Sequence, residues 1–170
     1  ASQASFVRKD GSDDEGDGGN FRGQERSNDT HASTTDPDAR LFKKSQGGEA
    51  HLAYLGHALT ENRYGFAVAA TVTHATGTAE REAALALMDK TADPSPDPAR
   101  TRRRTLGADK NYDTADFVTQ CRERNITPHV AQNTRRPGGS AIDASTSRHA
   151  GYENTQMKRR VAGRVNACAE

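Results

Sequence analysis

The amino-acid sequence predicts an α/β fold built on a mixed sheet. Short apolar runs and helical patterns follow one another in the order strand, hairpin, helix, strand, helix, strand, which is typical of this fold class. Only 32% of the 170 residues are hydrophobic, and there is no Trp. Because alanine fills many of the apolar positions, we expect a thin core and long irregular segments.

The first ordered elements are a hairpin and a helix. Two apolar runs, 51–60 and 66–73, are separated by a loop that contains Gly65, which indicates an antiparallel hairpin. A helix is expected after Thr78 as N-cap, since Glu80 and Glu82 then lie near the positive end of its dipole. Its apolar face comprises Ala83, Ala84, Leu87 and Met88.

A strand, a helix and a second strand are expected next. The pair Thr105 and Leu106 indicates a short buried strand that ends at Asp109. A helix follows, capped by Thr114 or Asp113, with Phe117, Val118 and Cys121 on one face, and it ends near Asn125. The run 126–131 predicts a strand, which Pro128 favours as an edge strand. The pattern then predicts a loop over 133–152 and a basic helix from about Thr155 to Arg164.

The chain is expected to have three regions. Residues 1–48 form a polar, largely irregular N-terminal segment, 49–134 a partial catalytic core, and 135–170 a loop and a basic C-terminal helix with a divergent tail. The acidic run 9–20 is a linker or a calcium loop, and the order of its residues does not match an EF-hand. Cys121 and Cys168 lie far apart without a CxxC motif, and no run is long enough to cross a bilayer, so a reduced, cytoplasmic chain is expected.

Basic side chains dominate the chain from Arg100 onward, whereas acids crowd its first forty residues. Such clusters either neutralise DNA phosphates, with release of counterions, or form a solvated surface. The predicted DNA-binding residues are Arg102, Arg103, Arg104, Arg135, Arg136, Lys158, Arg159 and Arg160.

Asp109 is the candidate site residue, and two interpretations remain open. An acid between a strand and a helix is either a solvated group that accepts backbone N–H bonds or a ligand for magnesium. Because two-metal chemistry requires carboxylates from several elements, one acid does not make a site. Asp36 and Asp38 lie in a turn-rich segment and are predicted to be turn formers.

Several ordered motifs carry a family resemblance. GHALTENRYGFAV, ATGTAEREAAL, TLGADKNYDTADFV and SAIDASTSRHAGY follow one another as in the DDE transposases of bacterial insertion sequences, in the group of the IS-four and IS-five elements. The resemblance runs from about Ala1 to Val161. It implies an incomplete ribonuclease-H-like fold with a mixed sheet flanked by helices. It also implies two Asp and one Glu that bind two Mg²⁺ ions, which activate water and then a DNA 3′-hydroxyl for strand cleavage and transfer.

Within this resemblance, Asp109 matches the second catalytic Asp, which implies that it is a metal ligand. Tyr112 matches the aromatic residue of the same motif. The first catalytic Asp of relatives precedes the segment matched by Ala1 to Phe6, and Ala162 and Gly163 stand where relatives have the Glu. We therefore expect a transposase catalytic-domain fragment with negligible activity alone. DNA is the expected partner, and a second copy of the chain is a candidate partner. The alternative is a non-enzymatic DNA-binding or non-functional remnant of a decayed transposase gene.

Overall fold

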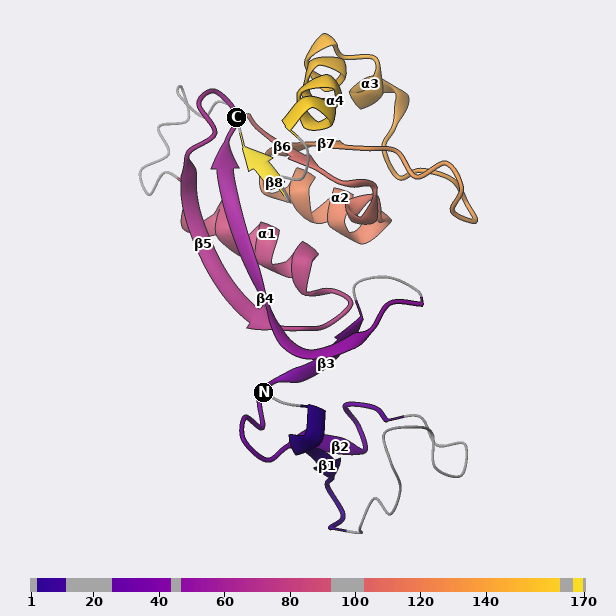
Figure 1. Cartoon of the computed structure of the whole chain (residues 1–170). Helices are drawn as coiled ribbons and strands as arrows, with labels where there is room; N and C mark the ends of the chain where they lie inside the picture. Colours follow the sequence, from indigo (N-terminus) through magenta and orange to yellow (C-terminus); the bar gives the residue numbers. More distant parts are fainter. Residues whose placement is uncertain (1–2, 12–25, 44–46, 93–102, 163–166, 170) are drawn as a thin grey trace. The chain divides into compact units, whose positions relative to one another are not determined.

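The computed structural model describes residues 3–11, 26–43, 47–92, 103–162 and 167–169, with side chains described as far as Met157 (Figure 1). The chain divides into two compact units, and each is described by itself. The first unit comprises Ala1–Gly56 and Val72–Ala79, and the second comprises His57–Thr71 and Glu80–Glu170. The three regions predicted from the sequence, with boundaries at 48 and 134, remain a prediction.

The first unit contains short strands in the segment where the sequence pattern indicated irregular chain. The short 3₁₀ turn η1 (Gln3–Ser5) leads into β1 (Phe6–Arg8), which pairs antiparallel with β2 (His31–Ser33). The Ser5 and Ser33 hydroxyls lie 2.8 Å apart and are buried. The ring of Phe6 stacks on that of His31, with centroids 5.4 Å apart. Polar hydrogen bonds therefore take the place of an apolar alternation, which explains why the pattern gave no strand signal.

The turn before β3 (Arg40–Lys43) depends on Asp36. Its carboxylate accepts from the Asp38 backbone N–H at 3.3 Å and from the Tyr54 hydroxyl at 2.8 Å. Its carbonyl accepts from the Ala39 N–H at 3.1 Å. β3 then pairs antiparallel with the first residues of β4 (Ala50–Glu61). The prediction that this segment forms a turn is confirmed.

The second unit holds a mixed sheet. The strand order is β4-β8-β6-β7, and β5 (Ala67–His74) pairs with β4 to complete the predicted hairpin. β6 (Arg104–Ala108) is parallel to β7 (Ile126–Val130), whereas β8 (Ala167–Ala169) is antiparallel to β6 and parallel to β4. β7 lies at the end of this order, as Pro128 predicted. The arrangement is the expected mixed α/β fold and is consistent with a ribonuclease-H-like sheet.

Helix α1 (Ala79–Lys90) presents the predicted apolar face. The predicted cap does not hold, because the hydroxyl that accepts from the Ala79 N–H belongs to Thr76, at 3.1 Å, and not to Thr78. The helix nevertheless begins at Ala79, directly after Thr78, where the pattern predicted its start. The predicted face is fully buried and consists of Ala83, Ala84, Leu87 and Met88.

Helix α2 (Ala115–Glu123) also follows the sequence prediction. Of the two candidate caps, Thr114 is the one used, since its hydroxyl accepts from the Phe117 N–H at 3.2 Å. The predicted face is buried at Phe117, Val118 and Cys121. Cys121 is a free cysteine, and burial raises the pKa of its thiol to about 12. The thiol therefore stays neutral and serves as a small core group.

The helices after β7 correct the sequence analysis. The segment predicted as loop contains α3 (Ala144–Ser147), and α4 (Ala150–Ala162) begins five residues before the predicted start at Thr155. The reason is long-range contact with the edge strand. The Tyr152 hydroxyl donates to the Val130 carbonyl at 2.8 Å, and the Gln156 amide donates to the His129 carbonyl at 2.8 Å. These bonds hold the first turns of α4 against β7, which a weak local pattern does not reveal.

One apolar core joins the sheet and the helices of the second unit. Its largest fully buried side chains are Phe117, Leu59, Met88, Leu106, Ile126 and Val130. The His129 imidazole contacts Thr155 of α4 at 3.0 Å, so by strand alternation its neighbours Pro128 and Val130 face the other side of the sheet. Helices thus flank the sheet. In the described part of the chain, no helix has the length and apolar character needed to cross a membrane.

Candidate metal-ligand position and nucleic-acid interface

Asp109 lies where the sequence predicted it, at the end of a central strand. It directly follows β6, which has β8 on one side and β7 on the other. It is the N-cap of the short 3₁₀ helix η3 (Lys110–Tyr112), and its carboxylate accepts from the Lys110 backbone N–H. The residue is exposed to solvent. The structure thus shows the local cap of the first interpretation, and the metal-ligand interpretation remains a prediction.

Tyr112 anchors this turn in the core. It is 3% exposed, and its ring meets that of Phe117 edge to face, with centroids 5.2 Å apart. Burial is the main cause that raises the pKa of the Tyr112 phenol, and the carboxylates of Glu80 and Asp109 raise it further. Glu80, at the start of α1, is therefore a second acid in this neighbourhood. The sequence pattern predicts only an interaction of Glu80 with the helix dipole, because no local pattern relates α1 to the end of β6.

Asp113 has a structural role that its sequence neighbourhood does not indicate. It is completely buried, and its carboxylate accepts from the backbone N–H groups of Asn133 at 2.6 Å and Ala141 at 2.8 Å. The Arg136 guanidinium donates to the Asp113 carbonyl. This acid fastens the loop after β7 to the turn that carries Asp109. Its partners lie 20 and 28 residues away, so no nearby sequence signal indicated them.

The described residues do not make a complete metal site. Carboxylate oxygen is the ligand type that Mg²⁺ prefers, and the exposed position of Asp109 suits such a role. However, in the part of the chain that the structure describes, no group of three or more His, Cys, Asp or Glu side chains could hold a metal ion. The chemistry of Asp109 therefore fits one ligand of a metal, and the geometry of the described residues does not supply the others.

The structure separates the predicted DNA-binding residues between the two ends of the sheet. Because β6 and β7 are parallel and in register from Arg104 to Ala108, the start of β6 lies at one end, and Asp109 and the loop after β7 lie at the other. Arg103 is exposed at the first end and Arg135 at the second. Sequence clustering alone could not assign these ends.

Two of the predicted basic residues are engaged inside the protein. Arg104 donates to the Met88 carbonyl at the end of α1, at 2.9 Å, and Arg136 donates to Asp113 as described above. Arg102 lies outside the described residues. Helix α4 includes Lys158, Arg159 and Arg160, of which the structure describes the backbone but not the side chains.

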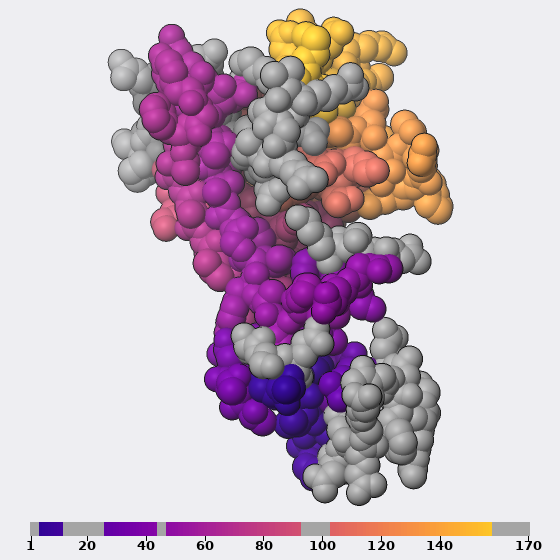
Figure 2. Space-filling view, in the orientation of Figure 1, coloured from indigo at the N-terminus to yellow at the C-terminus, as the bar shows by residue number. Residues whose placement is uncertain are grey.

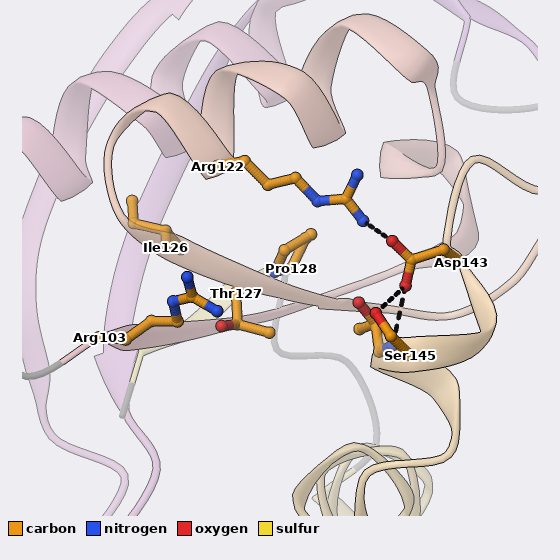
Figure 3. A pocket seen from close by; sticks show the side chains of 8 residues that line it. Arg103, Arg122, Ile126, Thr127, Pro128, Asp143 and Ser145 are labelled. Carbon is orange, nitrogen blue, oxygen red and sulfur yellow. Dashed lines mark hydrogen bonds and ion pairs between the residues drawn. The ribbon is translucent and has the colours of Figure 1, made fainter.

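A pocket of about 200 Å³ lies beside β7 and between α2 and α3 (Figure 3). Across it, the Arg122 guanidinium pairs with the Asp143 carboxylate, so this cation is already neutralised. The Arg103 and Thr127 side chains also line the pocket (Figure 3). The pocket is lined by Arg103, Arg122, Ile126, Thr127, Pro128, Asp143, Ser145 and Thr146.

Asp143 stabilises this wall of the pocket and gives it a pH dependence. The Thr146 backbone N–H, at 2.8 Å, and the Ser145 hydroxyl, at 2.7 Å, are the main causes that lower the pKa of its carboxyl below the ordinary 3.8, and Arg122 adds to them. A carboxyl whose pKa is lower in the folded state stabilises the fold above its unfolded pKa, and this contribution is lost as the pH falls below that value.

We expect Asp143→Ala to lower the free energy of unfolding by about 1 kcal/mol at neutral pH, because the variant loses the cap of α3. The difference from the parent chain should shrink as the pH falls below the ordinary carboxyl pKa. Urea unfolding at a series of pH values measures it. Asp143→Asn is the matched control, since asparagine keeps a capping oxygen without a titrating group. A difference that stays constant into acid would contradict the assignment.

Comparison with known proteins agrees with this arrangement. The family described as Transposase DDE domain matches residues 27–168, which is well over half of the chain and includes Asp109, Asp113 and both ends of the sheet. Neither a curated protein nor a solved structure matches the chain. The extent of the family match and the carboxylate at the end of the central strand agree with each other, and the chain therefore belongs to the DDE transposase family.

Proposed function

We propose that this chain acts on DNA in transposition and that Asp109 is one ligand of a divalent ion, Mg²⁺, in strand cleavage and transfer. The observation that carries the proposal is the position of Asp109, exposed directly after central strand β6 and inside the family match. An aspartate at this position combines accessibility with a rigid support, because Tyr112 anchors the turn in the core. We further propose that the chain falls in the group of the IS-four and IS-five elements.

The proposed DNA path begins with the cations at the Asp109 end of the sheet. Arg135 is exposed in the loop that Asp113 fastens to this end, and Lys110 is exposed next to Asp109. Phosphate contacts of this kind supply affinity that falls with salt and carries no sequence preference. Lys158, Arg159, Arg160 and Arg102 remain proposed contacts, and Arg103 is a further contact at the opposite end of the sheet.

We propose that the chain by itself binds DNA but has negligible strand-transfer activity. Within the resemblance, Asp109 is the acid that we match to the catalytic trio of the family. Removal of metal ligands takes away charge stabilisation of the transition state that is worth several kcal/mol. A DNA-binding chain without chemistry is therefore the expected behaviour in isolation, and cleavage would require carboxylates from elsewhere.

Fluorescence anisotropy with a labelled duplex at several salt concentrations tests the binding. Arg135→Ala should weaken binding uniformly across DNA sequences and reduce the slope of log K against log salt by about one. Lys90→Ala is the matched control, since Lys90 is an exposed cation in the last turn of α1, which Arg104 joins to the start of β6. No salt-dependent binding by the parent chain, or an equal loss in both variants, would contradict the proposal.

A nicking assay with Mg²⁺ or Mn²⁺ tests the role of Asp109. We expect no strand transfer by the chain alone. Metal-dependent nicking that disappears in Asp109→Asn would support the metal-ligand role and disprove the inactivity, whereas nicking that persists in this variant would disprove the role. Sedimentation of the same samples shows whether a second copy of the chain joins the complex.

A further inference from the structure

The tip of the hairpin between β4 and β5 is fixed by its own carboxylate. Glu61 accepts from the backbone N–H groups of Arg63 and Tyr64, both at 2.7 Å, and of Phe66 at 3.3 Å. Gly65 has φ +79°, a conformation that favours glycine, and its N–H donates to the Glu61 carbonyl at 3.1 Å. The tip is therefore held in one shape before any ligand arrives, which lowers the ordering cost of binding.

This fixed tip presents two aromatic rings to solvent. Tyr64 is 69% exposed and Phe66 is 68% exposed, and their ring centroids lie 6.2 Å apart with a 44° tilt. The Arg63 guanidinium lies over the Tyr64 ring, 5.2 Å from its centroid. The hairpin is visible at the surface in the upper part of Figure 2. Adjacent exposed rings can stack on a planar ligand, and the guanidinium beside them can attract an anionic group of the same ligand.

The register of the sheet places this tip at the end opposite Asp109. Glu61 pairs with Ala169 of β8, and Ala169 pairs with Leu106 of β6. The tip and the start of β6 therefore lie at the same end of the sheet. Ala108 is level with Ala167 and Leu59, so Arg63 lies about five residues further along than Asp109. At about 3.3 Å per residue this is roughly 17 Å, the length of about five stacked nucleotides.

We infer that the hairpin tip, comprising Arg63, Tyr64 and Phe66, is a base-stacking contact for unpaired nucleotides of the DNA bound at this sheet. The inference rests on the proposed function and extends it from phosphate contacts to bases. Aromatic rings stack on bases of any sequence, and an arginine beside them attracts the phosphate backbone. Exposed Arg103 at the same edge adds a second cation along this path.

A protein partner is the competing occupant of an exposed aromatic pair. The observations favour DNA, because the tip carries a cation directly on the ring and the neighbouring edge residue is also a cation. A protein-docking tip would show its effect on the oligomeric state of the chain and not on the choice between paired and unpaired DNA. The same samples can therefore be tested for both.

The experiment compares a blunt duplex with a forked duplex of the same length whose unpaired arm carries 2-aminopurine. The full chain is titrated into each, and anisotropy and 2-aminopurine fluorescence are recorded. The double variant Tyr64→Ala with Phe66→Ala should bind the fork about tenfold more weakly. It should bind the blunt duplex with unchanged affinity. The fluorescence change of the base should be lost in the same variant.

Two control variants make the result specific. Tyr64→Phe keeps the ring and should bind the fork as the parent chain does. Val72→Ala removes an exposed apolar side chain from β5 outside the tip and should have no effect. Because the side chains changed are exposed, thermal unfolding of every variant should match the parent and exclude misfolding.

The outcomes separate this inference from the proposed function. If the double variant keeps full affinity for the fork while the parent binds both DNAs, the stacking inference fails and the DNA function stands. Equal weakening on fork and duplex, or a change of oligomeric state with unchanged DNA binding, also overturns the stacking inference. If the parent binds neither DNA, the proposed function and the inference both fail.

Discussion

Asp113→Ala is expected to lower the free energy of unfolding of this chain by about 3–5 kcal/mol. The Asp113 carboxylate is completely buried and accepts from the backbone N–H groups of Asn133 and Ala141. Alanine leaves both part-buried donors without these partners, and each unsatisfied group costs about 1–3 kcal/mol, with the lost charged hydrogen bonds among the stronger kinds. Urea unfolding followed by circular dichroism measures the loss.

Two further variants locate the effect. Asp113→Asn keeps one acceptor oxygen but sets its amide N–H groups against a backbone donor, so it should fall between the parent and the alanine variant. Asp116→Ala is the matched control, because Asp116 is exposed on α2 and bonds only the Gln120 side chain among the bonds described, so its loss should stay within about 0.5 kcal/mol. Equal stability of Asp113→Ala and Asp116→Ala would show that the loop after β7 does not depend on the buried acid.

Phe117→Ala is expected to cost about 3–5 kcal/mol, the range for removal of a fully buried aromatic side chain. Phe117 is 1% exposed and belongs to the core cluster. Its ring also meets that of Tyr112 edge to face, with centroids 5.2 Å apart. The cavity should therefore loosen the turn that carries Asp109 as well as the core. Chemical denaturation gives the first effect, and the intrinsic fluorescence of tyrosine offers a readout of the second.

Thr119→Ala provides the comparison for this core variant. Thr119 is an exposed residue of the same helix, and alanine has the higher helix propensity, so the variant should be as stable as the parent or slightly more stable. A loss below about 1 kcal/mol for Phe117→Ala, with an unchanged dependence on denaturant, would mean that the core does not rest on this ring.

The two aspartates of the ADKNYD motif differ in their exposure to solvent. Asp109 is exposed at the end of β6, and Asp113, four residues later, is completely buried. The first is exposed, and the second holds the loop after β7 in place. Under the proposed function, a substitution at Asp113 would act on DNA binding through the position of Arg135, whereas a substitution at Asp109 would act on the proposed metal directly. Stability measurements distinguish these two effects.

Local patterns were sufficient for much of the second unit. Strand β6, the hairpin with Gly65, the apolar faces of α1 and α2 and the cap at Thr114 all follow from periodicity and turn chemistry, which depend on residues within a few positions of one another. The location of Asp109 at a strand end follows for the same reason. The ordered motifs also pointed to the family that the match over 27–168 supports.

Other features required contacts between residues far apart in the chain. The early start of α4 depends on Tyr152 and Gln156 meeting β7. The burial of Asp113 depends on a loop 20 to 28 residues later, and β8 depends on pairing with β4 and β6. The parallel register of β6 and β7 assigns Arg103 and Arg135 to opposite ends of the sheet. These hydrogen bonds form between backbone groups that become neighbours only in the folded chain. Local spacing along the sequence therefore does not predict them.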